Sequence, residues 1–121
     1  MKLSGVMIGT EDSKPLGEFY TKVFGEPGWN QDNWYGYDID GGNLMIGPHS
    51  EVKGKNGEPA RIITTYATDD VQGEFDRIKS AGATVVAEPY QPDAENYPKM
   101  WLATLADPEG NYLQLSTPWQ E

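Results

Sequence analysis

Hydrophobic residues recur with the period of an α-helix in two parts of the chain. The first apolar stripe consists of Leu16, Phe19, Tyr20 and Val23. Asp12 or Ser13 can cap the start of this helix, and Gly25 suits the position after its end. The spacing therefore predicts an amphipathic helix that begins near Asp12 and buries one face.

A second stripe with the same period lies in the other half of the chain. It consists of Val71, Phe75 and Ile78. Asp69 or Asp70 stands where this helix would begin, and Gly82 follows its end. Capping by short acidic side chains is favourable at a helix N-terminus. A second helix of similar length is expected here.

Segments with strand composition surround both helices. They cover residues 3–8, 34–39, 43–46, 61–66, 84–87, 100–105 and 111–116, with a short extended piece near Trp29. Asp40-Gly41-Gly42-Asn43 and Asp107-Pro108-Glu109-Gly110-Asn111 have the composition of tight turns between strands. Residues 50–59 read as a linker and residues 90–98 as a polar loop.

The order strand, helix and three strands occurs twice, and a short internal repeat supports this division. Gly17-Glu18-Phe19 in the first helix recurs as Gly73-Glu74-Phe75 in the second. We therefore predict a single α+β domain over residues 1–121, with module 1 at about 1–50, a linker at about 51–58 and module 2 at about 59–121. Neither module can bury its sheet face alone, so one shared sheet with two helices outside it is expected.

Charge and composition remove several classes of function. Nine basic and nineteen acidic residues give a net charge of −10, which argues against nucleic acid as a partner. The chain has no cysteine and one histidine, which excludes a disulfide framework, a thiolate metal site and a multi-histidine site. No apolar run is long enough to span a membrane, and no leader follows Met1, so a soluble, cytoplasmic protein is expected.

With these elements in this order, the chain resembles a known superfamily, the glyoxalase/bleomycin-resistance/extradiol-dioxygenase group with the vicinal oxygen chelate fold. Four features carry the resemblance: the opening strand with Asp12 and the helix end Val23-Phe24-Gly25, the second strand-helix with Asp70-Val71 and Ala81-Gly82-Ala83, the Asp107-Pro108-Glu109-Gly110-Asn111 turn, and the closing strand Tyr112-Leu113-Gln114-Leu115. The resemblance implies two βαβββ modules in an open, curved eight-stranded sheet, an incomplete barrel around a ligand cavity.

Metal-dependent members of this superfamily place their ligands at four positions. Carried over to this chain, those positions are Gly5, Met45, Ile63 and Gln114. Glycine and isoleucine offer no donor, a thioether suits softer metals, and one neutral amide oxygen cannot hold a divalent cation. We therefore expect no metal cofactor and a metal-free cavity.

Aromatic residues are the strongest candidates for ligand contacts, because flat or cationic molecules bind to aromatic rings. The predicted ligand-binding residues are Trp34, Tyr35, Tyr37, Met45, Ile63, Trp101, Tyr112 and Gln114. Strand alternation splits residues 34–37 between two faces, and packing in the core or a dimer interface is the alternative for each ring. His49 is interpreted as a surface linker residue rather than a general base, and Asp69-Asp70 as a cap rather than an acid–base pair.

The expected function follows from the resemblance and from the absence of suitable metal-coordinating side chains at the four positions named above. It is a metal-free protein of the bleomycin-resistance type that sequesters an aromatic or cationic small molecule, such as an antibiotic, without catalysis and as a homodimer. The alternative is a glyoxalase-like or dioxygenase-like enzyme with a non-standard active site. A third interpretation is a dimeric scaffold whose cavity is filled by its own side chains.

Overall fold

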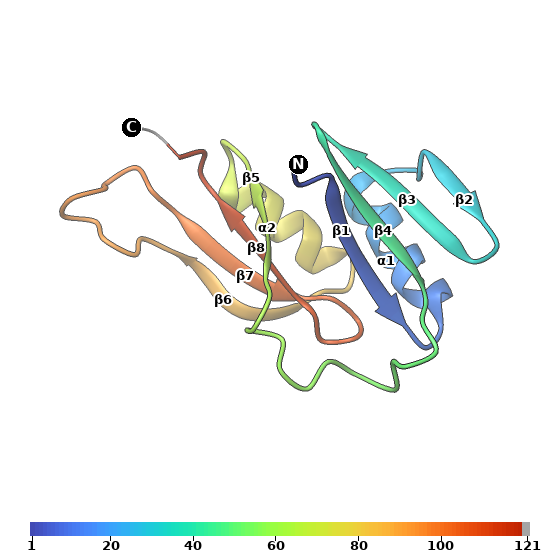
Figure 1. Cartoon of the computed structure of the whole chain (residues 1–121). Coiled ribbons are helices and arrows are strands. Elements are labelled where there is room, and N and C mark those ends of the chain that lie inside the picture. Colours follow the sequence, from blue (N-terminus) through green and yellow to red (C-terminus); the bar gives the residue numbers. More distant parts are fainter. Residues whose placement is uncertain (120–121) are drawn as a thin grey trace. The chain divides into compact units, whose positions relative to one another are not determined.

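The computed structural model describes residues 1–119, which divide into a first unit, Met1–Lys55, and a second unit that starts at Asn56. Each unit holds one helix and one four-stranded sheet, in the order strand, helix, three strands (Figure 1). The predicted α+β class and the two βαβββ modules are confirmed. No helix among the described residues is long and apolar enough to cross a membrane.

The first unit is built from β1 (Gly5–Thr10), α1 (Ser13–Phe24), β2 (Trp29–Gln31), β3 (Trp34–Ile39) and β4 (Gly42–Pro48). Its strands lie in the order β1-β4-β3-β2, and β1 runs parallel to β4 while the other pairs are antiparallel. We call this the first sheet. Its mixed topology arises because α1 carries the chain from β1 across to the far edge of the sheet.

Two-residue turns join the antiparallel strands of the first sheet. Asp40 and Gly41 connect β3 to β4 and both have positive φ angles, which confirms the tight turn expected there. Asp32 and Asn33 connect β2 to β3, and both also have positive φ angles. Asn, Asp and Gly tolerate this left-handed conformation, whose twist matches that of the flanking strands.

Helix α1 forms as its pattern predicts. The side chain of Asp12 accepts a hydrogen bond from the amide of Lys14 and caps the helix, and the amide of Gly25 closes the last turn on Thr21. The stripe Leu16, Phe19, Tyr20 and Val23 is at most 4% exposed. This face packs on the first sheet, against Leu44 and Ile46 of β4.

The second unit is built from β5 (Thr64–Ala67), α2 (Val71–Ser80), β6 (Thr84–Tyr90), β7 (Leu102–Ala106) and β8 (Tyr112–Ser116). The strand order of this second sheet is β5-β8-β7-β6, again with one parallel pair, β5 and β8. Val71, Phe75 and Ile78 of α2 are buried, as expected, against the sheet. Leu113 and Leu115 supply the facing side chains from β8.

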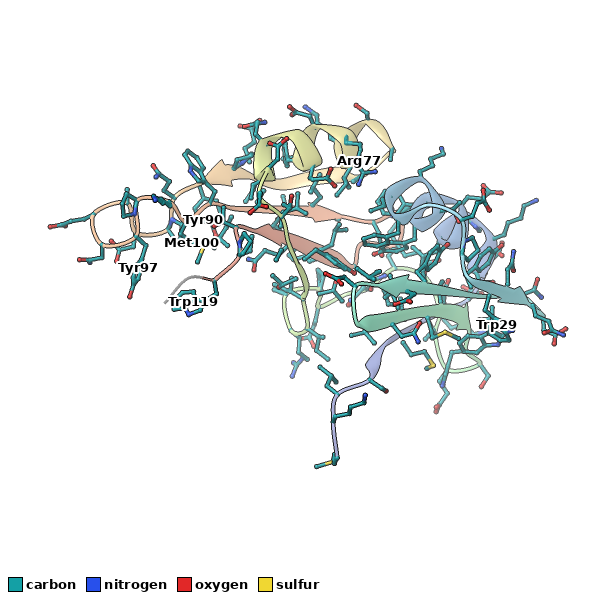
Figure 2. The ribbon with its side chains drawn as sticks, turned by 90° about the horizontal axis from the view of Figure 1, so that it is seen from above. Trp29, Arg77, Tyr90, Tyr97, Met100 and Trp119 are labelled. Carbon is teal, nitrogen blue, oxygen red and sulfur yellow. The ribbon has the colours of Figure 1, made fainter. Side chains whose placement is uncertain are left out.

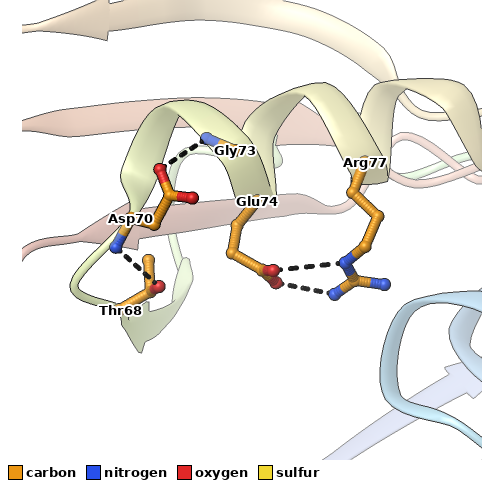
Figure 3. A network of polar contacts seen from close by, with 5 residues as sticks. All are labelled: Thr68, Asp70, Gly73, Glu74 and Arg77. Atoms are coloured by element: carbon orange, nitrogen blue, oxygen red, sulfur yellow. Dashed lines mark hydrogen bonds and ion pairs between the residues drawn. The ribbon is translucent and has the colours of Figure 1, made fainter.

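The start of α2 is held by a short polar network (Figure 3). Asp70 accepts a hydrogen bond from the amide of Gly73 at 2.9 Å, and its own amide donates to the hydroxyl of Thr68 at 3.1 Å. Arg77 pairs with Glu74 one turn further along, at 2.7 Å between Nη2 and Oε2. Asp70 is therefore the N-cap, which confirms capping as the interpretation of this residue.

The repeated Gly-Glu-Phe triplets do not occupy equivalent positions in the two helices. Gly17 lies five residues after the capping Asp12, whereas Gly73 lies three residues after the capping Asp70. Each glycine serves a different neighbour: a Cβ on Gly17 would lie 2.6 Å from the ring of Tyr35, and one on Gly73 would overlap the carboxylate of Asp70. Both modules are present, but the repeated triplet does not mark structurally equivalent residues in their helices.

Candidate functional site

The first sheet has one face covered by α1 and one face turned away from it, which we call the open face of the first sheet. Strand registers place Met7 opposite Met45, and Met45 opposite Gly36. Gly36 also pairs with Trp29 of β2, the strand that neighbours β3 on the edge away from β4. Paired residues of neighbouring strands share one face of the sheet, so Trp29 lies on the same face as Met45. Met7 and Trp29 are 56% and 47% exposed. This face is therefore apolar, rich in thioether and indole groups, and accessible.

Glycines shape this open face. The ring of Trp34 lies directly on Gly47, where a Cβ would overlap three of its ring carbons. Gly36 is covered in the same way by Met45, whose sulfur lies 3.0 Å from the place of a Cβ, and by Trp29. Because glycine has no side chain, the large groups of neighbouring strands can lie flat on the backbone. Trp34 and Met45, both predicted ligand contacts, thus share one face.

Tyr35 and Tyr37 lie on the opposite face of β3, toward α1. Tyr37 is 2% exposed, and its hydroxyl donates to the carbonyl of Gly17 at 2.8 Å and accepts from Thr21 at 2.8 Å. The ring of Tyr35 packs on Gly17. These contacts account for both rings as packing against the helix, so we do not include them in the proposed ligand surface.

Burial gives Tyr37 and Tyr66 a measurable effect on stability. It raises the pKa of both phenols above their usual value of 10.0. The folded chain then holds these protons more tightly than the unfolded chain, so stability is complete below pH ~10 and falls as pH rises further. We expect the urea midpoint to drop above pH ~10, and to drop less in Tyr37→Phe. Equal alkaline slopes in the two proteins would contradict this role of Tyr37.

The second sheet also has a face turned away from its helix. On β8 the buried Leu113 and Leu115 alternate with half-buried Tyr112, Gln114 and Ser116, as strand alternation predicts. Gln114 accepts a hydrogen bond from Thr65 of β5 at 3.3 Å. This face is therefore more polar than the open face of the first sheet.

Two further predicted contacts lie at the ends of strands in the second unit. Ile63 precedes β5 and is half-buried, and Trp101 precedes β7 and is 40% exposed. The amide of Trp101 donates to the hydroxyl of Thr117 at 3.1 Å. Trp101 thus stands close to the chain segment that leaves β8.

The four positions at which the resemblance implies metal ligands do not supply a suitable donor set. Gly5 has no side chain, and on the open face of the first sheet Met45 presents a thioether. In the second unit Gln114 offers an amide oxygen and Ile63 offers none. Residues 1–119 contain no group of three or more His, Cys, Asp or Glu side chains placed to hold a metal ion. The residues present do not fit a divalent cation.

His49 lies at the end of β4 and is exposed. Its Nδ1 atom accepts a hydrogen bond from the amide of Glu51 at 3.1 Å, which folds the chain locally after the strand. One of the two ring nitrogens is therefore engaged in a turn. This geometry agrees with its interpretation as a surface residue.

A pocket of about 380 Å³ lies in the second unit, where the loop before β7 meets the segment that follows β8. It is lined by Asp69, Asn96, Tyr97, Pro98, Lys99, Met100, Thr117, Pro118 and Trp119. None of the predicted ligand-binding residues is among them. The only signal in the sequence was the grouping of Tyr97 and Trp119 with prolines, which does not reveal that two distant segments meet.

Comparison with known proteins identifies the family. The sequence model of the glyoxalase-like domain family matches residues 5–116, so the chain belongs to this family. It is thereby a member of the glyoxalase/bleomycin-resistance/dioxygenase superfamily with the vicinal oxygen chelate fold, as the resemblance implied. No curated protein matches this sequence.

Solved structures share the fold at low sequence identity. A glyoxalase-related enzyme from Fulvimarina pelagi is 16% identical with a TM-score of 0.77, over 98% of this chain and 88% of that one. A glyoxalase/bleomycin resistance protein from Albidiferax ferrireducens is 22% identical with a TM-score of 0.75, over 96% and 98% of the two chains. A glyoxalase/bleomycin resistance protein/dioxygenase family enzyme from Burkholderia phytofirmans is 24% identical with a TM-score of 0.72, over 97% and 98%.

Proposed function

We propose that this protein binds an aromatic or cationic small molecule, a class that includes antibiotics, without a metal and without catalysis. The observation that carries the proposal is the open face of the first sheet, where Trp34 lies flat on Gly47 and Trp29 and Met45 lie against Gly36. Exposed indole and thioether groups offer a flat ligand both area and polarisable contacts. An indole face also attracts cations.

The charge and chemistry of the chain support the same ligand class. A net charge of −10 raises the local concentration of cationic molecules near the protein. The donor-poor set Gly5, Met45, Ile63 and Gln114 supports binding without a Lewis acid. In the second unit, Trp101, Tyr112 and Gln114 remain proposed ligand contacts, and Ile63 a proposed apolar one. Association of two copies remains part of the proposal.

A thermal-shift screen with cationic and polyaromatic compounds tests the proposal, followed by titration of any compound that raises the melting temperature. We expect Trp34→Ala to weaken binding by about tenfold or more, because a large aromatic contact is lost. Tyr90→Ala, which removes an exposed ring from β6 in the second unit, is the matched control and should bind normally.

Two results would contradict the proposal. One is the absence of stabilisation by every compound in the screen, and the other is binding that Trp34→Ala leaves unchanged. Elemental analysis after loading with divalent ions provides a separate check. A stoichiometric, tightly held metal would favour the alternative, a glyoxalase-like or dioxygenase-like enzyme.

A further inference from the structure

The pocket of the second unit is lined mainly by two segments that are far apart in the sequence, together with Asp69 just before α2. Residues 96–100 lead into β7, and residues 117–119 follow β8. Tyr97, Met100 and Trp119 are grouped at this end of the unit (Figure 2). The volume of about 380 Å³ falls in the range of pockets that take small organic ligands.

The loop wall of the pocket is ordered by its own hydrogen bonds. The amide of Tyr97 donates to the carbonyl of Asp93 at 2.8 Å, and the amide of Met100 donates to the carbonyl of Tyr97 at 3.1 Å. The side chain of Gln91 donates to the carbonyl of Pro98 at 2.7 Å. Asn96 is held on the carboxylate of Asp93 by its amide and its side chain, at 3.1 and 3.0 Å. Such a wall loses little entropy when a ligand binds.

The second wall is tied to the first. The hydroxyl of Thr117 donates to the sulfur of Met100 at 3.1 Å and accepts from the amide of Trp101 at 3.1 Å. The amide of Thr117 donates to the carbonyl of Trp101 at 3.1 Å. The two segments are therefore fixed relative to each other, and the pocket between them is preformed.

Two aromatic rings stand at the pocket with much of their surface uncovered. The ring centroids of Tyr97 and Trp119 lie 5.9 Å apart at an angle of 41°. Their side chains are 51% and 67% exposed. Because the rings are tilted against each other and about half or more of each residue is exposed, a third aromatic ring can pack against both and cover apolar surface that water now contacts.

The pocket also holds one charge of each sign. Asp69 and Lys99 both line it. Within residues 1–119 neither side chain takes part in an ion pair, although other charged groups of the chain, such as Glu74 and Arg77, do. A carboxylate and an ammonium group that share a pocket without pairing are complementary to a ligand that carries both charges.

We propose that this pocket binds a small aromatic zwitterion, of the chemical type of a free aromatic amino acid. Its ring packs against Tyr97 and Trp119, its ammonium group lies at Asp69 and its carboxylate lies at Lys99. The site does not depend on the function proposed above, because it shares no residue with the open face of the first sheet.

Calorimetric titration with four related probes tests this ligand class. The probes are L-phenylalanine, phenethylamine, 3-phenylpropionate and benzyl alcohol, which present the same ring with both charges, one positive charge, one negative charge or none. We expect L-phenylalanine to bind tightest. Each charged contact is solvent-exposed and contributes only about a twofold to fivefold gain, whereas the ring contributes more.

Variants locate the binding. Trp119→Ala should weaken every probe by about tenfold. Asp69→Asn should remove the advantage of L-phenylalanine over 3-phenylpropionate, and Lys99→Met its advantage over phenethylamine. Val86→Ala, which changes an exposed apolar residue of β6 outside the pocket, is the control and should leave all four affinities unchanged. Melting temperatures confirm that each variant is folded.

Several outcomes would overturn the proposal. They are no heat of binding with any probe, affinities that Trp119→Ala does not change, or L-phenylalanine binding no tighter than the singly charged probes. A second copy of the chain on the Tyr97–Trp119 pair is the competing occupant. A concentration-dependent dimer that Trp119→Ala abolishes and L-phenylalanine does not dissociate would also overturn it.

Discussion

Replacing Asp107 with alanine is expected to lower the free energy of unfolding by about 2–4 kcal/mol, because a buried acceptor of several hydrogen bonds is lost. Asp107 is 3% exposed and follows β7. Its carboxylate accepts from the amides of Glu109 and Asn111, at 2.9 and 3.0 Å, and from the side chain of Asn111. Alanine would leave these donors unpaired in a part-buried turn.

Urea denaturation monitored by circular dichroism measures this loss of stability. Two further variants serve as controls. Asp107→Asn keeps one oxygen for the two amides, so it should retain most of the stability. Asp76→Ala removes a carboxylate from the exposed face of α2, where it makes one side-chain hydrogen bond to Gln72, and should cost well under 1 kcal/mol. If Asp107→Ala cost no more than Asp76→Ala, the turn would not depend on this side chain.

The elements whose ends are set by local chemistry could be predicted from the sequence. Asp12 and Asp70 cap α1 and α2 as expected, and Gly25 follows the end of α1. The turn at Asp40 and Gly41 also forms as expected. In each case the residue that fixes the backbone acts on neighbours a few positions away, so the signal lies within one short window.

Strand ends were predicted less well, because a partner strand sets them. Residues 3–8 were expected as the first strand, but β1 is Gly5–Thr10, the stretch that pairs with Asn43 to Pro48 of β4. β6 continues to Tyr90, past the expected end at residue 87. It includes Pro89, which an edge strand tolerates since one row of its amides needs no partner, and its register shifts between Ala87 and Tyr90.

The candidate site could be predicted only in part. Alternation shows that Trp34 and Gly36 share one face of β3, and Tyr35 and Tyr37 the other, but it does not show which face meets the helix. Tertiary packing decides this: the ring of Tyr35 packs on Gly17 of α1, and the carbonyl of Gly17 accepts a hydrogen bond from the hydroxyl of Tyr37. The pocket at Tyr97 and Trp119 could not be foreseen, since it depends on the packing of two segments, before β7 and after β8, that lie far apart in the sequence.

The substitution Gly47→Ala is expected to weaken ligand binding on the open face of the first sheet by about tenfold or more. Gly47 is buried on β4, and the ring of Trp34 occupies the space where a side chain would be. A methyl group there must displace the indole, because ring carbons and the new Cβ cannot share the space. Loss of this packing should also cost about 1–3 kcal/mol of stability.

The matched control for this experiment lies on the same strand. A Cβ on Gly42 would meet nothing closer than the carbonyl oxygen of Ile39 at 3.6 Å, which is an ordinary contact. Gly42→Ala should therefore keep both the stability and the binding of the parent protein, and a ligand found in the thermal-shift screen is titrated against both variants. Equal affinities of Gly47→Ala and the parent would show that the indole of Trp34 need not lie flat on β4. The ligand would then have to be held by other groups, and the open face of the first sheet would lose its central part in the proposed function.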